Sequence, residues 1–316
     1  MGRVPRLGVR LHGGLTPGRC VELATAAERL GFASVWFAEN PLERGVLPAL
    51  AACAAATRRV ELGPGVWNPY LRHPAQIAMD IAALDDLADG RVTLGLGSGL
   101  AAPIQRLGID NGRPLSALKD TFAIVRALLR GENVAYKGSV FSVEGAKLSF
   151  KPRRPDLPLL MAARGEQALA LCGRIADGLM VSNMCPPGFA RHAAQAASAR
   201  RVVQYAPCAV GPDRVQATAT MKPVLAGMLK TFWGLAQRVP AARTSLVTYS
   251  GIPEADFATS EPDARFLDAF TVTGDAADCR RCLAAYAEAG VTDLVLTFVG
   301  PRPIDDMAYL LRACAP

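Results

Sequence analysis

With 316 residues, of which 51% are apolar, the chain can bury a large core, and its length allows one large α/β domain or two ordinary ones. No apolar run approaches the ~18 residues of a membrane-spanning helix, and the first residues, MGRVPRLGVRLHGG, lack the apolar segment of a secretory signal. The formal net charge of +7 comes from dispersed arginines, which favours an anionic small ligand over nucleic acid. We therefore expect a cytoplasmic protein that binds neither membranes nor nucleic acid.

The chain has eight cysteines and three histidines, and their spacing does not indicate a metal site. The one close pair of cysteines, Cys279 and Cys282, has no second pair and no histidine nearby, unlike a zinc site. The histidines are not paired with one another or with carboxylates. We therefore expect no metal, and free buried thiols in a reducing compartment.

Short apolar runs and helical patterns alternate along the chain. The predicted strands are 6–11, 33–37, 60–62, 92–96, 158–161, 177–181, 202–210 and 293–298. The predicted helices are 17–30, 47–57, 114–129, 166–174, 187–200, 214–239 and 276–289, with another that opens at Pro74 and a last one that ends at Cys314.

This alternation predicts a single (β/α)8 TIM barrel over residues 1–316. Two stretches interrupt the pattern, a small hairpin insertion at about 131–150 and an irregular or helical insertion at about 240–270. The alternative is a doubly wound open sheet, which would carry a glycine-rich nucleotide fingerprint directly after the first strand. His12-Gly13-Gly14 does not match that fingerprint.

The residues that follow the predicted strands are candidates for a site, because ligands of such barrels bind at the C-terminal ends of the strands. They are His12, Glu39, Asn40, Gly65, Val66, Asn68, Gly97, Ser98, Gly99, Ala162, Ala163, Arg164, Gly165, Ser182, Asn183 and Gly300. The set contains no hydrolase elbow of the G-x-S-x-G type. Small residues and accessible backbone instead favour a large flat cofactor at the barrel mouth.

Arg10 is a charged residue within the first predicted strand. A charge inside a barrel is costly unless it is paired. We therefore expect Arg10 to meet a carboxylate or an anionic ligand.

Four segments carry a family resemblance, in the family's order and at fitting spacing. They are GPGVWNPYLRHP, LADGRVTLGLGSG, LLMAARGEQALALCGRIADGLMVS and FTVTGDAADCRRCLAAYAEAGVTDLVL. With these segments the chain resembles the bacterial luciferase-like superfamily of (β/α) barrels. Within it, the chain resembles the branch that uses the deazaflavin coenzyme F420, in particular the methylenetetrahydromethanopterin reductases.

The resemblance implies roles for several residues around a deazaflavin ring. A non-prolyl cis peptide at Gly65-Val66 would support the ring from behind, Asn68 would hydrogen-bond the cofactor, and Glu39 would lie near the polar edge of the ring. Further cofactor contacts are implied for Gly97, Ser98, Gly99, Ala162, Ala163, Arg164 and Gly165. The last three fall where a helix N-terminus would receive the cofactor phosphate, and Arg164 would add a charged contact.

The activity implied by the resemblance is hydride transfer between F420 and an unidentified organic substrate, in a homo-oligomer that is a dimer or a tetramer. The alternatives are an FMN-dependent monooxygenase, a nicotinamide-using enzyme and a member of the fold without a cofactor. The candidate catalytic residues are Glu39, Asn40, His12 and Arg10. Three acid or base positions of the family are replaced here by Arg10, Asn40 and Leu100, so the substrate class does not follow from the resemblance.

Overall fold

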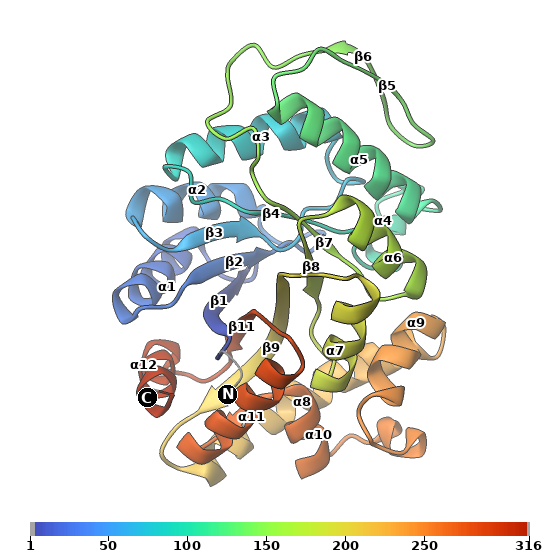
Figure 1. Cartoon of the computed structure of the whole chain (residues 1–316). Coiled ribbons are helices and arrows are strands. Elements are labelled where there is room, and N and C mark those ends of the chain that lie inside the picture. The colour runs from blue at the N-terminus through green and yellow to red at the C-terminus, as the bar shows by residue number, and fades with distance from the viewer. Residues whose placement is uncertain (1–3, 315–316) are drawn as a thin grey trace.

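Eight parallel strands form a nearly closed barrel in the computed structural model, which describes residues 4–314 (Figure 1). They are β1 (Arg6–His12), β2 (Ser34–Ala38), β3 (Glu61–Pro64), β4 (Leu94–Leu96), β7 (Leu159–Ala162), β8 (Gly178–Val181), β9 (Val202–Val210) and β11 (Asp293–Phe298). The strand order is β3-β2-β1-β11-β9-β8-β7-β4, and parallel bridges from Leu62 to Val92 and from Trp67 to Leu96 join its two ends. The predicted (β/α)8 barrel is therefore confirmed.

Helices surround the barrel on all sides (Figure 1). They are α1 (Pro17–Leu30), α2 (Val46–Ala56), α3 (Pro74–Leu87), α4 (Ala101–Gln105), α5 (Pro114–Leu129), α6 (Glu166–Ile175), α7 (Pro187–Ala196), α8 (Arg214–Ala236), α11 (Ala276–Glu288) and α12 (Pro303–Ala313). Within the described residues, no helix has the length and apolar character needed to cross a membrane.

Local signals place the helix ends. The Thr16 side chain accepts a hydrogen bond from the Arg19 N–H at the start of α1, and Gly31 ends that helix with φ of 101°. At the start of α11, Asp275 and Asp278 form a capping box.

Two excursions leave the barrel on different sides (Figure 1). The first is the hairpin of β5 (Val134–Lys137) and β6 (Ser142–Ala146), at the top of the view. The second runs from α8 through α9 (Pro240–Arg243), η1 (Thr244–Thr248), η2 (Glu254–Ala258) and α10 (Ala264–Phe270), at the lower right. It returns to the sheet through β10 (Val272–Gly274), a strand that the sequence did not predict and that pairs with β9.

The N-terminal end of the barrel is closed by an ion-pair network. The Arg201 guanidinium lies 2.6 Å from a Glu61 oxygen and 3.3 Å from an Asp293 oxygen, and Arg6 pairs with both carboxylates. Above this network, an apolar layer fills the barrel with Trp36, Leu160, Met180, Val203, Tyr205 and Val295. This leaves the opposite, C-terminal end of the barrel as the candidate ligand site.

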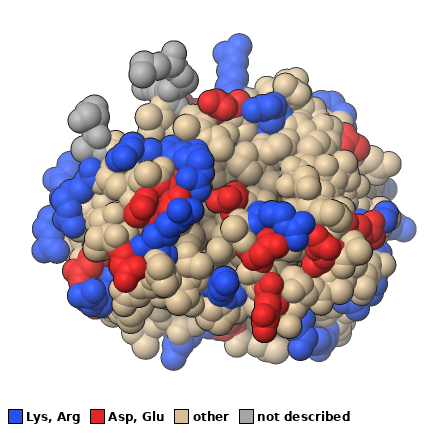
Figure 2. All heavy atoms as spheres, turned by 90° about the horizontal axis from the view of Figure 1, so that it is seen from below, with Lys and Arg blue, Asp and Glu red and all other residues tan. Residues whose placement is uncertain are grey.

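Charged side chains are mixed on the molecular surface. On the face shown in Figure 2, basic and acidic residues lie interspersed. Local ion pairs such as Arg281 with Asp268, at 3.1 Å, are typical of such a surface.

Candidate active site

The irregular backbone after β3 forms one wall of the barrel mouth. The Gly65-Val66 peptide is cis, and the Tyr205 hydroxyl donates a hydrogen bond to the Gly65 carbonyl at 3.2 Å. A Cβ atom on Gly65 would lie 1.7 Å from that hydroxyl oxygen. Only glycine therefore fits at position 65 while Tyr205 keeps its place.

Gly97 makes room for the Val66 side chain. A Cβ on Gly97 would lie 2.7 Å from Val66 Cγ2 and 3.0 Å from the Ala162 Cβ. Val66 and Ala162 are both half-buried beside the apolar layer of the barrel. Gly97 therefore packs three strand ends together, while Val66 and Ala162 present a small apolar surface to the mouth.

Asn68 ties the loops after β3 and β4 together. Its side chain is 5% exposed, donates to the Ser98 carbonyl at 2.7 Å, and accepts from the Tyr70 N–H at 2.9 Å. Gly99 lies next to Asn68 in a left-handed conformation with φ of 62°. The side-chain amide of Asn68 thus uses its nitrogen and its oxygen in hydrogen bonds within the protein.

Glu39 is held by an arginine that the sequence analysis did not single out. Both Glu39 oxygens accept from Arg72, at 2.8 and 2.7 Å, and the Glu39 side chain is 8% exposed. The Arg72 guanidinium lies 4.8 Å from the centre of the Trp67 ring. Glu39 is therefore a paired carboxylate. Its partner belongs to the YLRHP segment, which carried the family resemblance but no separate signal for this contact.

His12 and Asn40 differ in their surroundings. The His12 Nδ1 accepts from the Gly14 N–H at 3.1 Å, which closes the turn after β1. Burial lowers the pKa of His12, and the nearby Arg10 charge lowers it further. Asn40 is exposed, and its carbonyl accepts from the Glu43 N–H at 3.3 Å. His12 thus faces the charged interior of the mouth, whereas Asn40 lies at its rim.

Arg10 points into the barrel from β1. Its guanidinium carbon lies 5.4 Å from the Tyr205 ring centre, and Nη1 donates to the Thr297 hydroxyl at 3.4 Å. Its Nε is buried without a hydrogen-bond partner. The expected carboxylate partner is not present, since no ion pair to Arg10 forms within residues 4–314. Burial lowers the pKa of Arg10.

A second arginine lies at the end of β7, beside the start of α6. Arg164 donates to the Ser182 hydroxyl and to the Asn183 carbonyl, each at 3.3 Å, while its Nη1 is buried without a partner. The helix α6 begins after Gly165, and no side chain caps it. A Cβ on Gly165 would lie 3.2 Å from Ala241, so α9 covers this side of the mouth. Ala162, Ala163, Arg164 and Gly165 thus form a candidate anion-binding corner, with an unpartnered guanidinium nitrogen beside a helix N-terminus.

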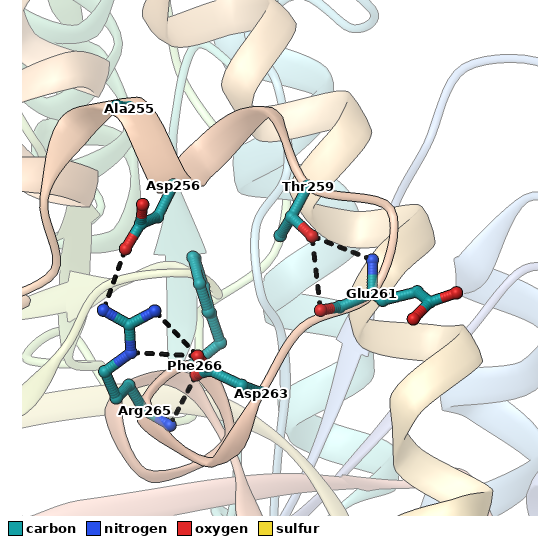
Figure 3. Close-up of a pocket in the computed structure, with 7 residues that line it drawn as sticks. All are labelled: Ala255, Asp256, Thr259, Glu261, Asp263, Arg265 and Phe266. Carbon is teal, nitrogen blue, oxygen red and sulfur yellow. Dashed lines mark hydrogen bonds and ion pairs between the residues drawn. The ribbon is translucent and has the colours of Figure 1, made fainter.

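A separate surface pocket of about 340 Å³ lies in the second excursion. Figure 3 shows its Arg265 guanidinium between Asp256 and Asp263, with hydrogen bonds between Thr259 and Glu261 beside it. The Arg265 charge of this pocket is paired with Asp256 and Asp263, and none of the strand-end residues lines the pocket. The candidate site is therefore the barrel mouth.

The fold and this mouth define a (β/α)8-barrel enzyme that binds its ligands at the C-terminal ends of the strands. A sequence model of the luciferase-like monooxygenase family matches residues 4–293. The chain belongs to this family, as its sequence predicted, and is an oxidoreductase.

Individual relatives agree with this assignment. The 5,10-methylenetetrahydromethanopterin reductase of Methanolobus tindarius is 31% identical over 300 residues, which span 88% of this chain and 90% of that protein. The F420-dependent glucose-6-phosphate dehydrogenase of Beutenbergia cavernae is 37% identical over 169 residues, or 50% of each chain. The solved structure of the coenzyme F420 dependent tetrahydromethanopterin reductase from Methanopyrus kandleri superposes with a TM-score of 0.83, at 23% identity and over 98% of each chain.

Proposed function

We propose that the chain transfers a hydride between coenzyme F420 and an organic substrate at the barrel mouth. The observation that carries the proposal is the anion-binding corner, where the buried, unpartnered Arg164 Nη1 lies beside the uncapped N-terminus of α6. Such a corner fits the phosphate of a nucleotide-like cofactor. The choice of F420 rests on the relatives, which are named as enzymes that depend on it.

The residues present fit a flat cofactor. Arg164 and the first N–H groups of α6 would hold its phosphate. Val66 and Ala162, half-buried next to the apolar layer, would contact its ring. When bound, the deazaflavin supplies the ring carbon that accepts or donates the hydride.

The residues at the expected acid and base positions leave few groups for proton transfer at this mouth. Both oxygens of Glu39 are engaged by Arg72, and Arg10, Asn40 and Leu100 occupy the positions of the family's acids and bases. Because His12 Nδ1 accepts from Gly14, the neutral imidazole carries its proton on Nε2. We propose His12 as the group that gives or takes the substrate proton.

The proposal is tested by titrating the purified full-length chain with F420, FMN and NADPH and following cofactor fluorescence. We expect the tightest binding with F420. Arg164→Gln should weaken it by roughly tenfold or more, because a charge-assisted contact to a phosphate is lost. Arg174→Gln, at the far end of the same helix, is the matched control and should bind as the wild type does. FMN binding more tightly than F420 would favour the monooxygenase alternative.

We also propose, from the sequence and the resemblance, that the protein acts in the cytoplasm as a homodimer or homotetramer. The absence of a membrane-spanning helix among the described residues agrees with the first point. Light scattering on the purified protein would measure the second.

A further inference from the structure

The barrel interior contains two buried arginines with opposite surroundings. At the N-terminal end, Arg201 meets the carboxylates of Glu61 and Asp293. Burial alone would lower the pKa of Arg201, but these two carboxylates outweigh it and the pKa is raised. At the C-terminal end, Arg10 has only a 3.4 Å hydrogen bond to Thr297 and the face of the Tyr205 ring. Both arginines have a buried Nε without a hydrogen-bond partner, but of the two only Arg201 has carboxylates beside its guanidinium.

Within residues 4–314, no carboxylate pairs with Arg10. Glu39, at the end of the neighbouring strand β2, is already bonded through both oxygens to Arg72. Glu43 is exposed in the loop after β2 and acts on Arg10 only at a distance. Tyr205 is neutral, because burial raises the pKa of its hydroxyl, which donates to the Gly65 carbonyl. A buried guanidinium in this position is unfavourable until an anion reaches it.

The strand order separates Arg10 from the anion-binding corner. Arg10 lies on β1 and Arg164 follows β7, and the order β1-β11-β9-β8-β7 places these strands on opposite sides of the barrel. An anion held at Arg164 and α6 therefore leaves Arg10 unpaired. At the mouth, Arg10 and Arg164 each keep a buried guanidinium nitrogen without a hydrogen-bond partner. The cofactor phosphate would account for Arg164 alone.

We propose that Arg10 binds a carboxylate of the substrate, so that the enzyme acts on a small carboxylic acid. This inference rests on the proposed function, since it assigns the second ligand of the same mouth. The Tyr205 ring covers one face of the guanidinium, and a carboxylate binds along a guanidinium edge, where two parallel N–H groups can donate to it. The unpartnered Nε lies on such an edge.

The test uses the full-length chain, with and without F420, and follows its melting temperature in acetate or benzoate. Acetamide and benzamide are the neutral matched probes, and inorganic phosphate is the third. We expect at least one carboxylate to raise the melting temperature and its amide to have no effect. Arg10→Gln should abolish this shift and weaken carboxylate binding by about tenfold or more. Arg10→Lys should retain part of the shift.

Stability separates a binding role of Arg10 from a structural one. Without ligand, Arg10→Gln should melt at the same temperature as the wild type or higher, because it removes an unpaired buried charge. Arg201→Gln, the control inside the same barrel, should melt lower and keep the carboxylate shift. The inference is overturned if neither carboxylate gives a shift that depends on Arg10, if phosphate gives the larger shift, or if Arg10→Gln mainly weakens F420 binding.

The same measurements distinguish the failure of the cofactor proposal from the failure of the carboxylate proposal. A chain that binds F420 but shows no Arg10-dependent effect of carboxylates contradicts only the substrate assignment. A carboxylate shift that disappears in Arg10→Gln, in a chain that does not bind F420, supports the carboxylate site and contradicts the cofactor assignment.

Discussion

Glu39 illustrates how a single partner changes the chemistry open to a residue. A carboxylate at a strand end is free to act as a base, but both oxygens of Glu39 accept hydrogen bonds from Arg72. The position of Glu39 could be predicted from the strand pattern. Its pairing could not, because Arg72 lies 33 residues further along the chain and reaches Glu39 only after the two loops have packed together.

The pairing of Glu39 with Arg72 predicts a double-mutant cycle. Arg72→Met should lower the free energy of unfolding by about 2–4 kcal/mol, since it leaves a buried carboxylate without its cation. Adding Glu39→Gln should recover part of that loss. Arg72→Lys keeps the charge but loses the two-point contact and the stacking on Trp67. Its free energy of unfolding should therefore lie between those of the wild type and Arg72→Met. Urea unfolding measures these three variants and Glu39→Gln alone, and strictly additive losses in the cycle would contradict the pairing.

Helices and strands could be predicted where apolar periodicity and turn residues indicated the same bounds. Short elements that depend on contacts with distant parts of the chain could not. The predicted bounds of α5, β9 and β11 match the structure, because apolar periodicity and flanking turn residues mark both ends. The strand β10 has three residues, too few to show an apolar periodicity in the sequence. It is held in place by its pairing with β9. Both strands of the hairpin, β5 and β6, lie within residues 131–150, and the turn between them is fixed from outside the hairpin.

That outside contact is Asp120 on α5. Its buried carboxylate accepts from the Val140 and Phe141 N–H groups, at 2.7 and 3.1 Å, and from the Tyr136 hydroxyl at 2.9 Å. Asp120→Ala should release the hairpin while the barrel stays folded. We expect faster proteolytic cleavage within 131–150 and unchanged F420 affinity. Asp80→Ala, on α3, is the control, and equal cleavage of the two variants would contradict this role.

At the scale of the whole molecule, the barrel has two ends with different functions. At the N-terminal end, the carboxylates of Glu61 and Asp293 pair with Arg6 and Arg201 and close the barrel. At the C-terminal end, Arg72 is paired with Glu39, whereas Arg10 and Arg164 each keep a buried nitrogen without a hydrogen-bond partner. The barrel could be predicted from the sequence. Most of the residues at its mouth could also be named, because the C-terminal ends of the strands meet at one edge of a parallel barrel. The sequence did not predict which carboxylates would be paired, since that depends on strand register.

The closed end predicts a dependence of stability on pH. Burial raises the pKa of Glu61, but its contacts with Arg201, Thr93 and Arg6 outweigh burial and the pKa is lowered. Its contribution is therefore complete above the ordinary value of about 4.3 and is lost as the pH falls through the lower, folded-state pKa. Glu61→Gln should lower the free energy of unfolding by about 2 kcal/mol at pH 7. The difference from the wild type should shrink below about pH 4.

Urea unfolding at a series of pH values measures this difference. Glu22→Gln is the surface control, because Glu22 is more than half exposed and pairs only with Arg19 on the same helix. A Glu61→Gln deficit that stays constant down to acid pH would contradict the assignment.

The return of the second excursion to the sheet has a consequence for the evolution of this barrel. The Gly211 N–H donates to the Gly274 carbonyl at 3.2 Å, so the segment from α8 to α10 leaves and re-enters at neighbouring points of two paired strands. Such a segment is a cassette, because one of another length or shape can span the same short gap without moving either strand. Through Ala241 the cassette reaches the corner at Gly165. Exchange of this cassette would let a lineage reshape one rim of the mouth while inheriting the barrel and its register intact.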